Sequence, residues 1–179
     1  MLPTTAFSNI LIVRAGSPVG DRSVISFLSI NGSPLIMPAT RTEEELDTFQ
    51  TISNWIGDIG LITTKADADE TLFVVEDEER GISNLVIDCE APVVEIQQTI
   101  MAVPEGADTA HLFERLLQMN GSLVHGAFML SEDGTQIRFR DTLRLATLDL
   151  EELRGTINAL HLALEEYGDE LIDLRRSLD

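Results

Sequence analysis

One continuous stretch decides the fold of this chain. Residues Thr109 to Leu174 read TAHLFERLLQMNGSLVHGAFMLSEDGTQIRFRDTLRLATLDLEELRGTINALHLALEEYGDELIDL. We expect it to form a short helix, three strands and a long helix, over residues 109–119, 123–130, 136–140, 142–145 and 149–174. Asp133-Gly134 predicts a tight hairpin turn between the first two strands. Helices that follow antiparallel strands in this order are typical of an α+β domain.

The long helix has the clearest pattern in the sequence. Asp149 is a good N-cap, and Glu152 follows three residues later as in a capping box. Apolar residues then recur at alternating spacings of three and four: Leu150, Leu153, Ile157, Leu160, Leu164, Tyr167, Leu171 and Leu174. Leu162 and Ile172 widen this stripe. The width favours a helix that covers a sheet, while a free coiled coil is the alternative reading of the same heptads.

A second helix and three further strands are predicted upstream. Thr42 and Glu45 form a capping box that begins a helix over 43–57. Strands are expected at Thr71–Val75, Ser83–Asp88 and Val93–Met101, and the acidic run Glu76–Glu79 between the first two is expected to be a solvated turn. The fold class is therefore α+β, an antiparallel sheet with helices packed on it, in the order α-βββ-α-βββ-α.

The first 40 residues differ from the rest of the chain in character. Ile10–Val13 and Val24–Ile30 are β-branched and nearly continuous in apolar content, which predicts buried strands. Asn31-Gly32 is a strong hairpin signal. We therefore divide the chain into an N-terminal strand and hairpin extension, residues 1–40, and a single α+β unit, residues 41–179.

Composition limits the classes of function. The chain has 31 acidic and 12 basic residues, for a formal net charge of -19. Such a surface disfavours nucleic acid and acidic membranes as partners. No apolar run approaches the roughly 20 residues that a membrane span needs. Cys89 is the single cysteine, so an intrachain disulfide is impossible, and a cytoplasmic location fits best.

A search for catalytic chemistry finds no constellation. The three histidines, His111, His125 and His161, lie on different predicted elements and outside any metal-ligand motif. Cys89 has no nucleophile signature around it and is expected to be a small buried residue. We therefore predict no catalytic residue, no cofactor and no metal site.

Basic residues are concentrated on one predicted strand. Ile137 and Phe139 should face one side of that strand, while Arg138 and Arg140 face the other. Arg144 extends this basic patch. One interpretation is cross-strand pairing with Glu132, Asp133 or Asp141. The other is a contact for an acidic partner or an acidic group of a substrate.

Particular segments resemble a known family. Leu116–Leu123 (LLQMNGSL), then Gly126–Leu130 (GAFML) and the Asp133-Gly134 turn, resemble type III secretion chaperones of the CesT/Tir-chaperone type and the related YbjN group. The resemblance covers residues 43–174. It implies a small acidic homodimer that binds extended segments of a partner protein. The 40 residues before the first predicted helix depart from the secretion chaperones and favour the YbjN kind.

The same resemblance implies a place for the dimer contact. The middle helix would help to form it, and its apolar residues on two sides agree with this: Leu112, Phe113, Leu116 and Leu117. We expect a non-enzymatic chaperone-like or adaptor protein that binds another polypeptide. One alternative is a small-ligand sensor or an enzyme, with a pocket near Trp55, His125 and Arg138. Another is a structural regulatory module in a larger assembly.

Overall fold

The computed structural model describes residues 29–30, 33–34 and 43–178, with side chains from residue 47 onward. The chain divides into two compact units, Met1–Thr40 and Arg41–Asp179. In the first unit, β1 (Ser29–Ile30) pairs antiparallel with β2 (Ser33–Pro34). Ile30 lies opposite Ser33, as expected for a hairpin around residues 31–32. The strand predicted at residues 10–13 and most of that at 24–30 lie outside the described residues.

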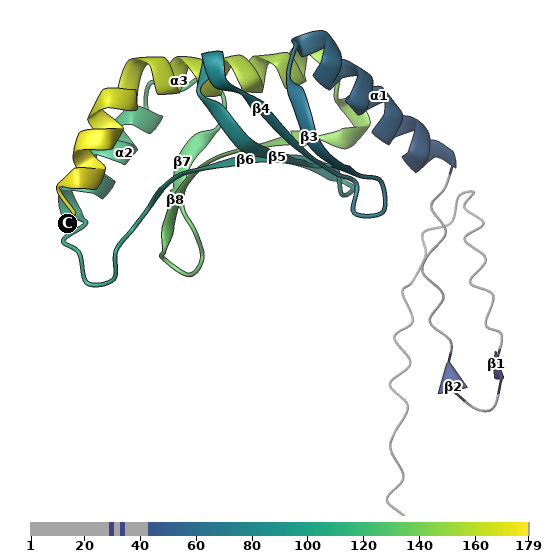
Figure 1. Ribbon diagram of the computed structural model, residues 1–179, viewed down its shortest axis with the longest axis horizontal. Helices are drawn as coiled ribbons and strands as arrows, with labels where there is room; N and C mark the ends of the chain where they lie inside the picture. The colour runs from purple at the N-terminus through teal and green to yellow at the C-terminus, as the bar shows by residue number, and fades with distance from the viewer. Residues whose placement is uncertain (1–28, 31–32, 35–42, 179) are drawn as a thin grey trace, which may run out of the picture. The chain divides into compact units, whose positions relative to one another are not determined.

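The second unit is an α+β domain, as the sequence predicts. Its six strands form one antiparallel sheet in the order β3-β4-β5-β6-β8-β7. Their bounds are β3 Ile62–Asp67, β4 Leu72–Asp77, β5 Ile82–Asp88, β6 Val93–Ala102, β7 Ala127–Leu130 and β8 Gln136–Arg144. The helices are α1 Glu43–Ile59, α2 Ala110–Asn120 and α3 Leu150–Arg176, with short 3-10 turns η1 Glu78–Arg80 and η2 Leu145–Thr147. In Figure 1, α1 and α3 lie along one face of the sheet, and none of the described helices covers the other.

The strands are distributed differently from the expected three and three. Four strands precede α2 and two follow it. Strand β3 was not among the predicted strands, because this edge strand is exposed along nearly its whole length and has no apolar alternation. The two strands predicted at 136–140 and 142–145 are one strand, β8. The Asp141 carboxylate faces α3, where it accepts a hydrogen bond from the Thr156 hydroxyl at 2.7 Å. With this polar partner, Asp141 fits within the strand, which continues to Arg144.

The core fills the space between the covered face of the sheet and the helices. Alternate residues of the strands point into it, including Phe73, Ile87, Ile96 and Phe139, each 0% exposed. The Phe49 ring of α1 stacks on Phe73 with ring centroids 4.2 Å apart. The predicted period-two pattern is therefore confirmed, with helices on only one side of the sheet.

Helix α3 follows its sequence signals closely. The Asp149 carboxylate accepts a hydrogen bond from the Glu152 amide at 2.8 Å, which confirms the N-cap. The helix then runs without a break through both of its glycines. One expectation is wrong: Leu162 and Ile172 do not widen the buried stripe, since they are 59% and 50% exposed. Helix α3 is curved along its length (Figure 1).

The residues that carry the family resemblance shape the edge of the sheet. The Asn120 side chain accepts a hydrogen bond from the Phe128 amide at 2.7 Å and donates one to the Phe128 carbonyl at 2.9 Å. It thus takes the place of a neighbouring strand at the outer edge of β7. Gly126 has a φ of 67°, and a Cβ there would collide with the Phe139 ring. Glycine is therefore required at that position.

The acidic run Glu76–Glu79 is only partly the predicted solvated turn, since Glu76 and Asp77 end β4 and Glu78 and Glu79 lie in η1. Asp77 caps η1 by accepting a hydrogen bond from the Arg80 amide, and its carboxylate pairs with the Arg80 guanidinium at 2.7 Å. The same guanidinium donates to the Ile59 carbonyl at 2.8 Å. His161 Nδ1 lies 3.2 Å from the Arg80 carbonyl oxygen. This turn therefore links the end of α1 to the middle of α3.

Candidate functional site

The uncovered face of the sheet carries the arginine row that the sequence predicts. Ile137 and Phe139 are buried under the helices, while Arg138, Arg140 and Arg144 alternate with them along β8. The expected partners Glu132, Asp133 and Asp141 do not neutralise this row by ion pairs within the described residues. The Arg138 guanidinium instead donates to the side-chain oxygens of Gln136 and Gln97, at 2.8 to 3.3 Å.

The other two arginines of the row differ in their partners. Arg140 forms an ion pair with Glu95 on the neighbouring strand β6. Arg144 is exposed, and among the described residues no ion pair to it is found. Among the described residues, Arg138 and Arg144 therefore form no close ion pair, although the charge of Arg138 helps to lower the pKa of Asp133.

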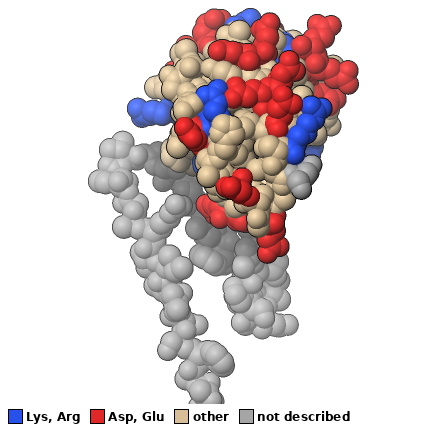
Figure 2. Space-filling model, turned by 90° about the vertical axis from the view of Figure 1, so that its left-hand side faces the viewer, with Lys and Arg blue, Asp and Glu red and all other residues tan. Residues whose placement is uncertain are grey.

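Charge on the uncovered face differs from that of the chain as a whole. The strand register places equal numbers of bases and acids on it: Lys65, Arg138, Arg140 and Arg144 against Asp67, Glu76, Asp88 and Glu95. The chain carries a net charge of -19, so the acidic excess lies elsewhere. Figure 2 views one such region, the end formed by α2 and the C-terminal half of α3, where red acidic groups outnumber blue basic ones.

Helix α2 has one buried and one outward side. Leu112 and Leu116 are 1% and 5% exposed and belong to the core, whereas Leu117 is 72% exposed and Phe113 is partly buried. The Arg115 guanidinium holds the helix against α3 through two hydrogen bonds to the Glu170 carboxylate, at 2.6 and 3.0 Å. Through these hydrogen bonds, Arg115 lowers the pKa of Glu170 and Glu170 raises the pKa of Arg115.

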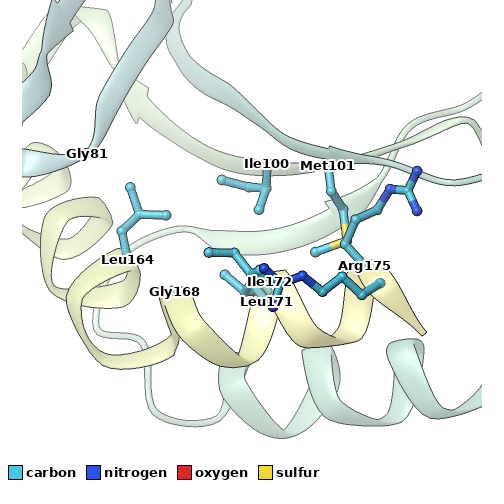
Figure 3. A pocket seen from close by; sticks show the side chains of 9 residues that line it. Gly81, Ile100, Met101, Leu164, Gly168, Leu171, Ile172 and Arg175 are labelled. Carbon is cyan, nitrogen blue, oxygen red and sulfur yellow. The ribbon is translucent and has the colours of Figure 1, made fainter. Parts of the chain in front are cut away.

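An apolar groove lies between the C-terminal half of α3 and the sheet. Its volume is about 470 Å³, and it is lined by Ile100 and Met101 of β6, by Gly81, and by six residues of α3: Leu164, Gly168, Leu171, Ile172, Arg175 and Arg176. In Figure 3 the Leu164 and Ile172 side chains project from α3 toward the strand that carries Ile100 and Met101. Ligand sites commonly have volumes in the range 300 to 1,000 Å³.

The groove lies beside the place where β5 and β6 separate. The pairing of β5 with β6 is limited to Val86–Asp88 with Glu95–Gln97. Beyond that point, hydrogen bonds from the buried Gln98 side chain of β6 replace the backbone hydrogen bonds between β5 and β6. It accepts from the Ser83 amide at 3.0 Å and donates to the Gly81 carbonyl at 3.2 Å. Sequence reasoning missed this groove, since its signals are an exposed isoleucine and a glycine within an apolar helix.

The residues proposed for a small-ligand pocket do not converge. Trp55 lines a small pocket of about 160 Å³ with Leu145 and Leu148, and neither His125 nor Arg138 belongs to its lining. His125 lies toward α3, with its Nδ1 4.0 Å from the Asp141 carboxylate. Arg138 is on the opposite, uncovered face of the sheet. The three side chains therefore share no site.

Other reactive groups have structural surroundings. Cys89 is buried just after β5, and loss of solvation raises the pKa of its thiol to about 12, so it stays protonated at neutral pH. Among the described side chains, no group of three or more His, Cys, Asp or Glu is placed to hold a metal ion. In the same part of the chain, no helix combines the length and apolar character that crossing a membrane requires.

Solved structures share this architecture. YbjN from E. coli, a proposed transcription regulator, matches with a TM-score of 0.51 and 13% identity over 68% of this chain and 92% of YbjN. A chain of the HopA1–SchA chaperone–effector complex matches with a TM-score of 0.50 and 9% identity, over 76% and 99% of the two chains. At such low identities these matches show a common fold.

Comparison at the level of sequence gives the family. None of the curated proteins matches this chain. The sequence model of the CesT_Tir_1 family matches residues 45–177, which include all three helices' apolar faces and the whole six-stranded sheet. The resemblance seen at Leu116–Leu130 is therefore confirmed over nearly the entire second unit, and the chain belongs to the CesT_Tir_1 family.

Proposed function

We propose that this protein binds another polypeptide in a chaperone-like or adaptor role, without catalysing a reaction, and that it acts as a homodimer. The observation that carries the proposal is the match of the CesT_Tir_1 family over residues 45–177. The fold shared with a chain of the HopA1–SchA chaperone–effector complex supports it. A cytoplasmic location stays a prediction.

The outward side of α2 is the proposed dimer contact. Leu112 and Leu116 face the core of their own chain and offer no surface to a second copy, so we restrict the contact to Phe113 and Leu117. A leucine that is 72% exposed beside a partly buried phenylalanine is an apolar surface that a second copy could cover. The Arg115–Glu170 pair fixes the orientation of this side relative to α3.

The arginine row is the proposed contact for an acidic segment of the partner. Arg138, Arg140 and Arg144 lie on the uncovered face of β8, where outward positions recur every second residue and Thr142 stands between the last two arginines. An extended segment has the same period of two, so its carboxylates could meet the row in register. Guanidinium groups form strong paired hydrogen bonds to carboxylates. Bases and acids are equal in number on this face, so an acidic segment meets less repulsion here than the net charge of -19 suggests.

Oligomeric state tests the first part of the proposal. Light scattering during size-exclusion chromatography should give about twice the chain mass of 19.7 kDa. Leu117→Asp should yield the monomer mass, because a charge cannot be buried in an apolar interface. Leu162→Asp is the matched control, an exposed leucine on α3 that should leave the dimer intact. A monomeric native protein would rule out the homodimer.

Complex formation tests the second part. A polypeptide that co-purifies with the native protein is purified, and calorimetry then measures whether the two components form a complex of fixed stoichiometry. Replacing Arg138, Arg140 and Arg144 by Glu should weaken binding by about tenfold or more, and increasingly so at low salt. Arg154→Glu on α3 is the control. Failure of every purified candidate to form a stoichiometric complex contradicts the proposed function.

A further inference from the structure

The apolar groove along α3 is lined by a glycine of the helix, Gly168. Gly168 lies in the middle of a 27-residue helix, where glycine is the least favourable ordinary residue apart from proline. A Cβ at this position would have no heavy atom within 4 Å. Packing against this chain therefore does not require glycine at this position. Its effect is to leave the space between Leu164, Leu171 and Ile172 open.

The ends of the groove are chemically different. At one end it closes, because Gly81 approaches α3 so closely that a Cβ on it would lie 3.3 Å from Leu164 Cδ1. Arg175 and Arg176 line it in the last turn of the helix. These are the only charged residues of its lining, in a chain with 31 acids and 12 bases.

The rim arginines select the charge of an occupant. The Arg176 guanidinium reaches Asp173 at 3.0 Å, but both side chains are about three-quarters exposed, so this pair is weak and easily exchanged. A carboxylate of an incoming segment could replace Asp173 at this guanidinium and form paired hydrogen bonds to it. The groove therefore combines apolar walls with a preference for an anion at one end.

We propose that this groove binds a short apolar segment of a partner polypeptide, and that acidic residues flanking the segment are held by Arg175 and Arg176. The proposal rests on the proposed function and names the chemistry of the segment that is bound. Bulky apolar side chains of the segment lie over Gly168, between Ile172 and Ile100. The segment's carboxylates lie at the arginine end.

A pair of synthetic peptides tests this assignment directly. Both carry a dansyl group and the segment Leu-Phe-Ile-Leu, which is followed by Glu-Glu in one peptide and by Lys-Lys in the other. Fluorescence anisotropy with the full chain should show the Glu-Glu peptide binding about tenfold more tightly. The expected order is the reverse of what the net charge of -19 alone would give. Equal or tighter binding of the Lys-Lys peptide overturns the role of the arginines.

Filling the groove gives the second measurement. Gly168→Leu places a side chain in the open space and should reduce binding of the Glu-Glu peptide by about tenfold or more. Gly57→Leu is the matched control, a helical glycine of α1 with no heavy atom within 4 Å of its Cβ position. Both variants should melt at or above the native temperature, since leucine favours a helix over glycine. Unchanged binding by the folded Gly168→Leu variant overturns the site.

A double variant separates the effect of charge from that of shape. Arg175→Gln combined with Arg176→Gln should remove the preference for Glu-Glu over Lys-Lys, while binding of the apolar segment persists. If the native protein binds neither peptide at millimolar concentration, this assignment of the groove is wrong. The proposed function is tested separately, by whether the co-purified polypeptide forms a stoichiometric complex. If Gly168→Leu instead abolishes the dimer, the occupant is a second copy and the partner assignment is overturned.

Discussion

The two faces of the six-stranded sheet are made by the same strands but depend on different interactions. On the covered face, residues such as Ile137 and Phe139 lose all contact with water against α1 and α3. On the uncovered face, their neighbours Arg138 and Arg140 bond to side chains of adjacent strands while remaining partly in water. Burial of apolar area supplies most folding free energy, and exposed ion pairs supply little. The first face therefore holds the fold together, and the second is free to meet a partner.

The largest effect should follow from emptying the covered face. Phe139→Ala removes a side chain that is 0% exposed and that packs edge-on against Phe128, with ring centroids 6.3 Å apart. We expect it to lower the free energy of unfolding by about 3–5 kcal/mol. Urea denaturation followed by circular dichroism measures this. A loss below about 1 kcal/mol would break the distinction between the faces.

A buried polar side chain of the covered face should have the next largest effect. Gln98→Leu keeps the volume but leaves the Ser83 amide and the Gly81 carbonyl without their partner. We expect a loss of about 1–3 kcal/mol. Hydrogen exchange of the Ser83 amide should become faster, whereas amides in the β6–β8 ladder keep their protection. Unchanged exchange at Ser83 would contradict the proposed reason for the separation of β5 and β6.

The hairpin between β7 and β8 should respond to acid. Hydrogen bonds from Ser131 and Thr135 lower the pKa of Asp133 to about 2 from its ordinary value of 3.8. Because the folded pKa lies below the unfolded one, the carboxylate stabilises the turn fully above about pH 4. That contribution is lost as the pH falls through about 2. A carbon-detected NMR titration of the Asp133 carboxyl group measures the midpoint, and a midpoint near 4 would contradict it.

The smallest effect should come from the uncovered face. The Arg140 side chain is 42% exposed and pairs with Glu95. Arg140→Gln should therefore change the free energy of unfolding by less than about 0.5 kcal/mol. The same denaturation experiment measures it beside Phe139→Ala, one residue away along β8. A loss above about 1 kcal/mol would show that this face also contributes to stability and is not simply available to a partner.

The sequence determined the elements whose signals are local. The cap at Asp149, the apolar stripe of α3, the turn at Asp133-Gly134 and the alternation along β8 could each be recognised within a few residues. Local periodicity was sufficient there because a buried face imposes its spacing on the chain. The family resemblance at residues 116–130 rests on signals of this kind, including Asn120, whose side chain closes the edge of β7.

Tertiary structure decided the features that depend on contacts distant in sequence. Edge strand β3 has no covered face, so its sequence has no alternation to recognise. Leu162 and Ile172 were expected to widen the buried stripe of α3, yet no other part of the described chain covers them and they are exposed. The groove involves Gln98 on β6, Gly81 between η1 and β5, and Gly168 on α3. The sequence by itself determined which residues could be buried; which of them are buried depends on what other parts of the chain pack against them.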